Sequence, residues 1–445
     1  MCAVIPAAAR LQPPLVGAPM WSDGCQLSRG GPGDHGPVHQ LLSAVFNGPT
    51  KESYSASLDD PFYEPNDRVV VRRNMRVLAH AQVTQRAAHF CGSTFAIGGL
   101  HGVATAPEFR RRGFATAVLQ AAETIMQNDG AVWGTLATSN PRFFRANGWV
   151  ICGRHSLARA PTRQVLAQLS ARGVPAPTEL PHLRPLRQVE VPSVMKVYAA
   201  TQSGRHGAIE RSESYWRWLI SRGGIDHIFV ALGGSDRRAW DQFDSPVIGY
   251  VIVKENRILE LNVSAASDEF SREQLAEQLL SRACHEAIER DLHVVQFHAP
   301  EHDRLFELFA NCNGEIHQRE QYLGEVQMMK LFDPAGFVER ITPQLQARVA
   351  AAGLKSAELG LSIDGEKRLL SISRRSVKFK PAPLGRNYLR FNSAEFVRLL
   401  LGHDTLDNSI EQRRVHASTR LARRLGAIIF PSLSLWHSPW DELYL

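Results

Sequence analysis

The stretch from residue 103 to residue 115 constrains this chain more than any other. It reads Val-Ala-Thr-Ala-Pro-Glu-Phe-Arg-Arg-Arg-Gly-Phe-Ala: an extended run, a basic loop and the start of a helix. Gly113 lets the backbone approach a ligand closely, and the first N–H groups of a helix lack partners and carry partial positive charge. This arrangement predicts a binding site for a diphosphate.

Apolar periodicity places this loop inside a unit of mixed strands and helices. Strands are predicted over 68–72, 77–83, 94–105, 131–138 and 149–152, and helices over 113–127 and 140–146. The segment 35–60 is expected to supply the first helices. The pair Gly98-Gly99 predicts a bulge or bend in its strand.

The same order of elements recurs further along the chain, which indicates an internal repeat. Strands are predicted over 247–253, 258–263 and 294–298, and helices over 271–290 and 303–310. The repeat lacks the basic glycine loop, because residues 265–269 read Ala-Ala-Ser-Asp-Glu at that place. An acidic loop repels a diphosphate, so we expect the second copy to bind none.

The remaining sequence supplies a leader, a linker and a third unit. We predict a disordered leader over 1–22, a first domain over 23–160, a proline-rich linker over 161–182, a second domain over 183–326 and a third over 327–445. In the third unit, Asp364-Gly365 predicts a hairpin turn, Ser393 a helix cap, and 413–425 a helix. A last strand is expected to end at Phe430-Pro431.

Arg110, Gly113 and Ala115 fit the pattern Arg-x-x-Gly-x-Ala. This loop resembles the acetyl-CoA loop of the GNAT N-acetyltransferase superfamily. The order of three units resembles the enhanced intracellular survival (Eis) acetyltransferases of bacteria, whose third domain is similar to sterol carrier protein 2 (SCP2). The resemblance implies an α+β fold class, with tandem GNAT folds (mixed central sheets flanked by helices) followed by an SCP2-like α/β domain.

The resemblance also implies acetyl-CoA as co-substrate and a set of residues that hold it. They are Val103, Thr105, Arg110, Arg111, Arg112, Gly113, Phe114, Ala115 and Asn140. Backbone N–H of the strand that carries Val103 is expected to hold the thioester carbonyl oxygen. For Asn140, a plain helix cap before Pro141 is an equally open reading.

The catalytic base implied by the resemblance is the α-carboxylate of the last residue, Leu445. Asp441, Glu442 and Trp149 are the candidate substrate-binding residues. Relatives carry a tyrosine that serves as the general acid. It lies either four residues before the glycine of the turn after the short helix (here Gly148) or directly after that glycine. Here these positions hold Phe144 and Trp149, which have no hydroxyl. Ser139 is the candidate acid, and an ordered water, bulk solvent or Tyr444 are the alternatives.

The leading hypothesis is an acetyl-CoA-dependent N-acetyltransferase that acts on the primary amine of a cationic small molecule or peptide. The alternative is a non-catalytic acyl-CoA- or lipid-binding protein with a degenerate GNAT site. The missing tyrosine favours this alternative, and the intact loop opposes it. The resemblance also implies a homo-oligomer and points to a hexamer.

Composition restricts which classes of partner and which cellular compartment are expected. The net charge is +7, but the basic residues are scattered without an aromatic stripe, so no nucleic-acid partner is expected. No apolar run is long enough for a membrane span. The six cysteines follow no C-x-x-C spacing, and the histidines of 285–302 match no zinc motif. We expect a cytoplasmic protein without a bound metal.

Overall fold

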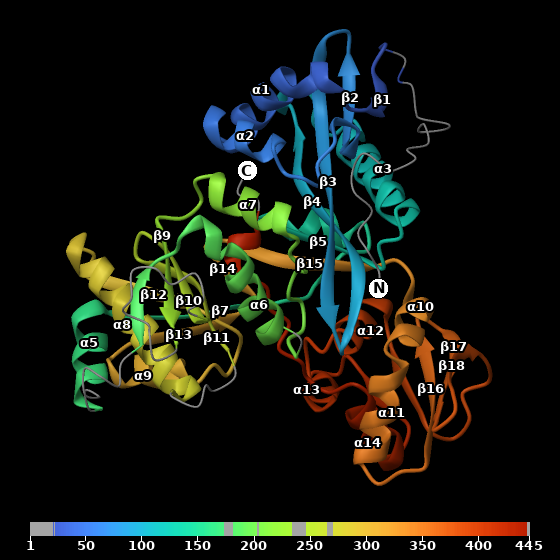
Figure 1. Ribbon diagram of the computed structural model, residues 1–445. Helices are drawn as coiled ribbons and strands as arrows, with labels where there is room; N and C mark the ends of the chain where they lie inside the picture. Colours follow the sequence, from blue (N-terminus) through green and yellow to red (C-terminus); the bar gives the residue numbers. More distant parts are fainter. Residues whose placement is uncertain are drawn as a thin grey trace.

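The computed structural model describes residues 21, 23–172, 181–202, 204–233, 246–264 and 270–442 of the 445-residue chain. The expected leader (except Trp21), the acidic run 265–269 and the expected base Leu445 lie outside the described residues. The described part contains three sheets flanked by helices (Figure 1). No described helix is both long and apolar enough to cross a bilayer.

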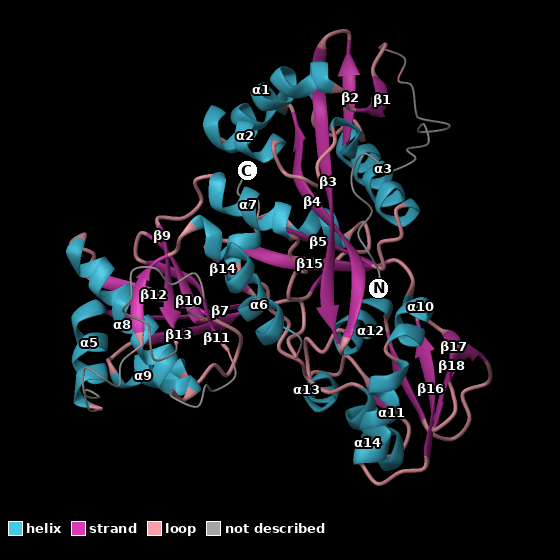
Figure 2. Ribbon diagram, in the orientation of Figure 1, coloured by secondary structure: helices cyan, strands magenta, loops and turns pink. Residues whose placement is uncertain are grey.

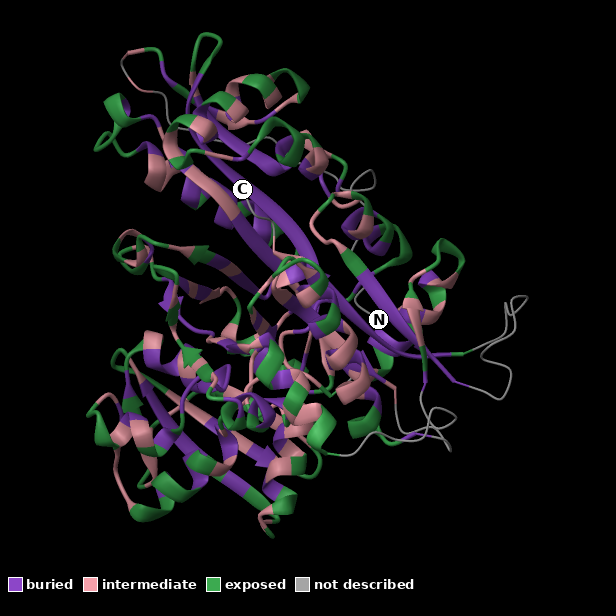
Figure 3. Ribbon diagram, turned by 90° about the vertical axis from the view of Figure 1, so that its left-hand side faces the viewer, coloured by how far each residue is buried: buried purple, intermediate pink, exposed green. Residues whose placement is uncertain are grey.

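The first sheet is built on two long strands, β3 (Arg76–Phe90) and β4 (Ser93–Thr105). Its other strands are β1 (Gln26–Arg29), β2 (Arg68–Arg73), β5 (Trp133–Thr138), β6 (Val150–Ile151), β14 (Gln321–Tyr322) and β15 (Glu325–Leu331). Figure 2 shows α1 (His35–Phe46) and α2 (Lys51–Leu58) on one side of β3 and β4, and α3 (Phe114–Asn128) on the other. Strand β3 is buried over most of its length, whereas β4 alternates between buried and half-buried residues (Figure 3).

Helix α3 forms because its apolar residues recur at helical spacing. Val118, Ala122 and Ile125 are buried against the sheet. Each large apolar side chain buried in this way contributes ~2 kcal/mol to stability. The short α4 (Pro141–Arg145) follows β5. All the elements predicted for the first unit are therefore present, and 35–60 supplies α1 and α2 as expected.

The second sheet has the strand order β13-β7-β12-β11-β10-β9-β8. Its strands are β7 (His155–Pro161), β8 (His182–Pro185), β9 (His227–Leu232), β10 (Val247–Lys254), β11 (Arg257–Val263), β12 (Val294–His298) and β13 (Glu315–Arg319). Its helices are α5 (Thr162–Ala171), α6 (Val191–Gln202), α7 (Glu213–Ser221), α8 (Arg272–Glu289) and α9 (Leu305–Asn311). The order β10-β11-α8-β12-α9 repeats the order β3-β4-α3-β5-α4 of the first unit.

The two units exchange their last long strands. Strand β7 follows the first unit in sequence, yet it pairs antiparallel with β12 and β13 of the second sheet. Conversely, β15 follows the second unit, yet it pairs antiparallel with β5 and β6 of the first sheet. The sheets therefore cross the predicted boundaries at 160 and 326. The predicted linker contains α5, which packs on α8, and its last residue, His182, begins β8, which pairs with β9.

The third sheet has the order β18-β17-β16-β19-β20. Its strands are β16 (Ser356–Ile363), β17 (Glu366–Ser373), β18 (Val377–Pro381), β19 (Tyr388–Phe391) and β20 (His416–Ala417). The helices are α10 (Pro334–Arg340), α11 (Thr342–Ala351), α12 (Ser393–Leu400), α13 (Leu406–Glu411) and α14 (Arg420–Ile429). Short 3-10 turns are η2 (Pro32–Asp34), η3 (Pro65–Asp67), η4 (Pro107–Phe109), η6 (Gln188–Glu190) and η7 (Pro439–Asp441).

Three local predictions for the third unit are corrected. Asn392, not Ser393, caps α12, because its Oδ1 accepts from Glu395 N at 2.8 Å. The expected helix over 413–425 begins only at Arg420, since 416–417 pair with β19 as β20. No strand ends at Phe430, because α14 runs to Ile429. The hairpin turn at Asp364-Gly365 is confirmed, with φ values of 49° and 90°.

Aromatic packing joins the third unit to the first. Phe337 on α10 lies 5.1 Å from Phe95, 5.4 Å from Phe90 and 5.9 Å from Trp133, measured between ring centroids. These rings belong to one buried cluster that continues into the second unit through Trp216. The three units therefore share core, which fixes their relative positions.

Candidate active site

The site lies where two parallel strands separate. Strands β4 and β5 pair only from Ile97 opposite Trp133 to Gly99 opposite Thr135. Beyond this point β4 continues to Thr105 and β5 to Thr138. The separation opens a cleft of about 860 Å³, lined by both strands, the basic loop, α4, β15 and the end of the chain.

A bulge in β4 lies at this opening, three residues beyond the predicted place. Gln82 faces His101 and His80 faces Ala104, so Gly102 and Val103 together face Ala81. Gly102 has φ of 57°, and its carbonyl accepts a 2.7 Å hydrogen bond from His80 Nδ1. Burial, and then the charge of Arg68, lowers the pKa of His80 to about 3, so the ring is neutral. His80 thereby fixes the bulge.

Gly98 and Gly99 have a different role from the predicted bulge. A Cβ atom at Gly98 would lie 2.5 Å from Met126 Cγ of α3. A Cβ atom at Gly99 would collide with Thr84 Oγ1 and lie 2.8 Å from His101 Nε2. The predicted bulge at Gly98-Gly99 is therefore wrong, because both residues pair in regular register with β3. These two glycines serve close packing.

The basic loop turns sharply into α3. Arg111 and Gly113 have positive φ values of 63° and 82°, and Gly113 is the N-cap of α3. A Cβ at Gly113 would meet open space, so its backbone is accessible from the cleft. Thr105 Oγ1 is buried and has no hydrogen-bond partner among the described residues. The loop, the helix end and this hydroxyl fit a diphosphate and the chain attached to it.

Eight of the nine predicted cofactor residues line the cleft. They are Val103, Thr105, Arg110, Arg111, Gly113, Phe114, Ala115 and Asn140. Arg112 is placed differently: it forms an ion pair with Asp23, and its guanidinium lies 5.1 Å from the centre of the Phe114 ring. Its side chain is therefore held on the outer side of the loop.

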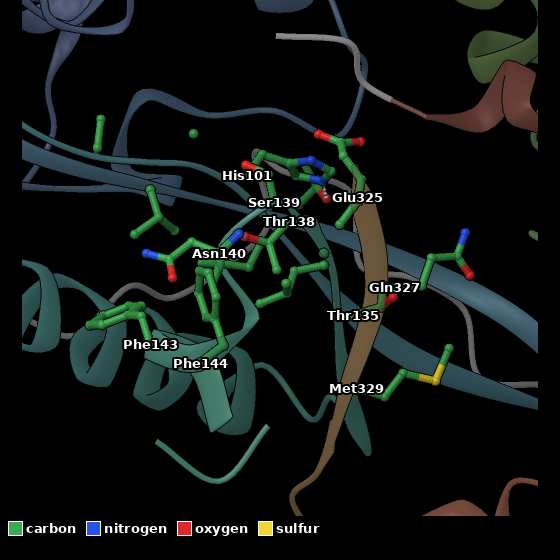
Figure 4. A pocket seen from close by; sticks show the side chains of 18 of the residues that line it. His101, Thr135, Thr138, Ser139, Asn140, Phe143, Phe144, Glu325, Gln327 and Met329 are labelled. Carbon is green, nitrogen blue, oxygen red and sulfur yellow. Dashed lines mark hydrogen bonds between the residues drawn. The ribbon is translucent and has the colours of Figure 1, made fainter. Parts of the chain in front are cut away.

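Asn140 and Ser139 lie at the end of β5 and both line the cleft. The amide of Asn140 makes no capping hydrogen bond to α4, so the helix-cap reading is not what the structure shows. Phe144 also lines the cleft, with no hydroxyl to offer. Figure 4 shows Asn140, Phe143 and Phe144 together, and Glu325, Gln327 and Met329 along β15.

Trp149 lies in the core and not in the cleft lining. Its side chain is 2% exposed, and its Nε1 donates to Glu123 Oε1 at 2.7 Å. Lys330 Nζ holds the other oxygen of Glu123, also at 2.7 Å. The prediction that Trp149 contacts the substrate does not fit this placement, because Gly134 of β5 packs directly on its ring.

The last described segment of the chain packs on the second unit and reaches the cleft from that side. Leu435, His437, Asp441 and Glu442 all line it. Trp440 anchors this segment: it is 1% exposed and packs 5.1 Å from Trp216. Asp441 and Glu442, the predicted substrate contacts, thus both line this cleft, and Asp441 is bound by Arg211 at 2.8 Å.

Several residues that line the cleft were not predicted from the sequence. His101 on β4 lies beside the bulge and bonds Thr84 Oγ1 through Nε2 at 3.0 Å. Burial, followed by the charge of Arg86, lowers the pKa of His101 to about 4. Glu325 and Gln327 come from the exchanged strand β15. Alternation in 325–331 indicates a strand, but no local pattern tells which sheet the strand joins.

Glu325 brings a carboxyl group to the cleft, close to that of Glu442. Burial, and then the neighbouring charge of Glu442, raises the pKa of Glu325 above its usual range. His437 Nε2 lies 3.5 Å from Glu442 Oε1. The described residues contain no group of three or more His, Cys, Asp or Glu side chains arranged to hold a metal ion.

A family model agrees with this geometry. Residues 29–152 match the model described as the acetyltransferase (GNAT) domain. The first unit is a GNAT acetyltransferase domain. The family model thus covers the cleft-forming strands, the basic loop and α3 of the GNAT domain. No curated protein sequence matches the chain significantly.

Solved structures share the fold over more than nine-tenths of the chain. A GCN5-related N-acetyltransferase from Anabaena variabilis matches with a TM-score of 0.70 and 15% identity, over 93% of this chain and 99% of that chain. A GCN5-related N-acetyltransferase from Kribbella flavida matches with a TM-score of 0.68 and 15% identity, over 93% and 97%. Eis1 from Mycobacterium abscessus matches with a TM-score of 0.61 and 14% identity, over 92% and 97%. At these identities the likeness concerns the fold, GNAT domain included.

Proposed function

We propose that this chain is an acetyl-CoA-dependent N-acetyltransferase that acts on the primary amine of a cationic small molecule or peptide. The observation that carries the proposal is the separation of β4 from β5 directly before the basic loop and α3. Acetyl-CoA supplies an activated acetyl group. The loop and the α3 N-terminus bind its diphosphate through N–H groups and the charges of Arg110 and Arg111.

The bulge at Gly102 supports a role in orienting the reacting carbonyl. A strand that leaves its regular pairing exposes backbone N–H groups toward the cleft side. In the proposal, N–H of the segment around Val103 polarises the carbonyl oxygen. His80, through its hydrogen bond to Gly102, keeps this segment rigid.

The proposal assigns the base to the α-carboxylate of Leu445. The described end of the chain, Glu442, already lines the cleft, and three further residues span at most ~10 Å. A carboxylate in this cleft accepts the proton of an ammonium acceptor, while Glu325 and Glu442 attract its positive charge. Ser139 is the proposed acid, because it has the hydroxyl that Phe144 lacks.

A second function is favoured by one observation. Neither Phe144 nor Trp149 offers a proton to the leaving thiolate. A non-catalytic protein that binds acyl-CoA or a lipid needs the loop but not the acid. The likeness of the third unit to sterol carrier protein 2, the hexameric assembly and the cytoplasmic location belong to the proposal as further expectations.

Thiol release from acetyl-CoA tests the two functions against each other. The purified protein is mixed with acetyl-CoA and a panel of polyamines, aminoglycosides and lysine peptides. Amine-dependent release supports the enzyme, whereas CoA binding by calorimetry without release for any amine supports the binding protein. Absence of CoA binding overturns both.

A short deletion tests the base. Removing Leu443–Leu445 leaves the anchors Trp440 and Asp441 in place, so the fold and CoA binding are expected to persist while kcat falls by about 100-fold or more. The shortened chain still ends in a carboxylate, on Glu442, but three residues earlier than in the intact chain. A matched control replaces Leu443 alone with Ala, which keeps the chain length and the terminal carboxylate on Leu445. Equal kcat for the deletion and the intact chain contradicts the assignment.

A further inference from the structure

The second unit contains a strand pair that separates in the same way as the pair in the active site. Strands β11 and β12 are parallel and pair only at Arg257 opposite Gln296 and at Ile258 opposite Phe297. Helix α8 connects them, as α3 connects β4 and β5. By this alignment Glu260 of β11 stands where β4 has His101, one residue before the bulge.

The end of the chain crosses this second opening. Glu301 N, just after β12, donates to Ser434 Oγ at 3.1 Å. Ser438 Oγ donates to the carbonyl of Leu259 on β11 at 3.3 Å. The tail, defined here as residues 434–442, therefore contacts β11 and the loop that follows β12, beyond the point where the two strands separate.

A buried arginine ties the tail to β11. Arg211, in the loop before α7, directs Nε and Nη2 to the two carboxylate oxygens of Asp441, each at 2.8 Å. The same guanidinium bonds Glu260 through Nη1 at 3.2 Å and Nη2 at 2.7 Å. The side chains of Arg211, Glu260 and Asp441 are 0%, 1% and 3% exposed.

Further groups hold Glu260 ionised within this cluster. The hydroxyl of Tyr250 donates to Glu260 Oε1, and Asn262 Nδ2 donates to the same oxygen at 3.1 Å. Burial raises the pKa of Glu260, but the charge of Arg211 and these hydrogen bonds outweigh burial and bring the pKa below its usual range. One arginine thus faces two carboxylates, and no other guanidinium among the described residues forms an ion pair with either of them.

We propose that the opening between β11 and β12 is the binding site of the chain's own tail. In this proposal Arg211 is the positioning residue that places the tail in the active-site cleft of the GNAT domain. The repeat that lacks the basic loop then has a function, because the opening between its parallel strands binds the tail of the same chain. This inference rests on the proposed function where it concerns turnover, but the docking of the tail does not depend on it.

Hydrogen exchange on the full chain without substrate tests the docking. Asp441→Asn keeps the Arg211–Glu260 pair and the shape of the side chain, so the fold is expected to persist. Breaking the buried ion pair should lower the protection of the amides of 434–442 by about 100-fold. Arg217→Met, on the exposed face of α7, is the matched control and should leave this protection unchanged. Equal protection in the wild type and Asp441→Asn overturns the proposal.

Kinetics and binding separate positioning from a general loss of structure. Arg211→Met strips the partner from both carboxylates and, if folded, should expose the tail at least as much as Asp441→Asn. For Asp441→Asn we expect kcat to fall about tenfold or more, with the Kd for CoA within twofold of the wild type, since the loop is untouched. A proportional loss of CoA binding and kcat overturns the positioning role. A wild type that turns over no amine, while the tail stays protected through Asp441, overturns the proposed function and upholds the docking.

Discussion

Met328 at the centre of β15 lies opposite Leu136 on β5, although the entire second unit separates them in sequence. The pair is buried, with Met328 fully inaccessible. Without β15, the edge of β5 and its apolar face lose their cover. A chain cut after residue 161 is therefore expected not to unfold cooperatively. Thermal melts followed by near-ultraviolet circular dichroism, with the full chain as control, measure this, and a sharp melt of the fragment contradicts it.

Gly99 should be intolerant of any side chain. Gly99→Ala places a methyl group against Thr84 Oγ1, and we expect a loss of about 1–3 kcal/mol in the free energy of unfolding. The double variant with Thr84→Ala removes the obstructing hydroxyl and should recover a good part of that loss. Urea denaturation measures both values. Strict additivity of the two single variants argues against the collision.

The two neighbouring arginines of the loop should differ in their effect on CoA binding. Arg111 lines the cleft, whereas Arg112 is paired with Asp23 outside it. Arg111→Asn removes the charge with a residue that accepts positive φ, and should weaken CoA binding about tenfold. Arg112→Asn is the matched control and should change the Kd by less than threefold. Calorimetric titration with CoA measures the Kd of both variants. An equal loss of affinity in the two variants would mean that both arginines contact the diphosphate.

Trp149 should matter for stability and not for turnover. Trp149→Phe removes the Nε1–H that bonds Glu123, and a cost of about 1–3 kcal/mol in unfolding free energy is expected. Because the ring lies outside the cleft, kcat and KM for the amine should stay within twofold. A rise in KM for the amine without a change in kcat would show instead that Trp149 contacts the substrate.

The pair His437–Glu442 should make stability depend on pH. Burial lowers the pKa of His437, but the hydrogen bond and charge of Glu442 and the charge of Asp441 raise it more, so the net pKa lies above the ordinary value. A histidine with a raised folded pKa stabilises fully below its unfolded pKa and loses this contribution as the pH rises through the folded value. His437→Gln should therefore lower Tm at about pH 6, and the difference should shrink by about pH 9. His285→Gln, on the exposed face of α8, serves as the control. A difference that grows with pH contradicts the sign.

Much of the GNAT domain was accessible from sequence because its signals are local. The diphosphate loop depends on residues adjacent in the chain: a strand end, Gly113 and a helix start. The helical spacing of Val118, Ala122 and Ile125 likewise fixes α3 by itself. The position of the bulge was missed because Gly98, Gly99 and Gly102 look alike in sequence. Only the register against β3 shows which of them leaves the ladder.

Three features follow from the order of the amino acids alone: the repeated order of strands and helices, the loop that suits a diphosphate, and the lack of a tyrosine at positions 144 and 149. Three others became known only from the folded chain: β7 and β15 change places, Arg112 turns away from the cleft, and Arg211 holds Asp441. The reason is physical. Secondary structure and a turn follow from neighbouring residues, whereas strand partners and buried ion pairs depend on contacts between distant segments, which no local pattern encodes.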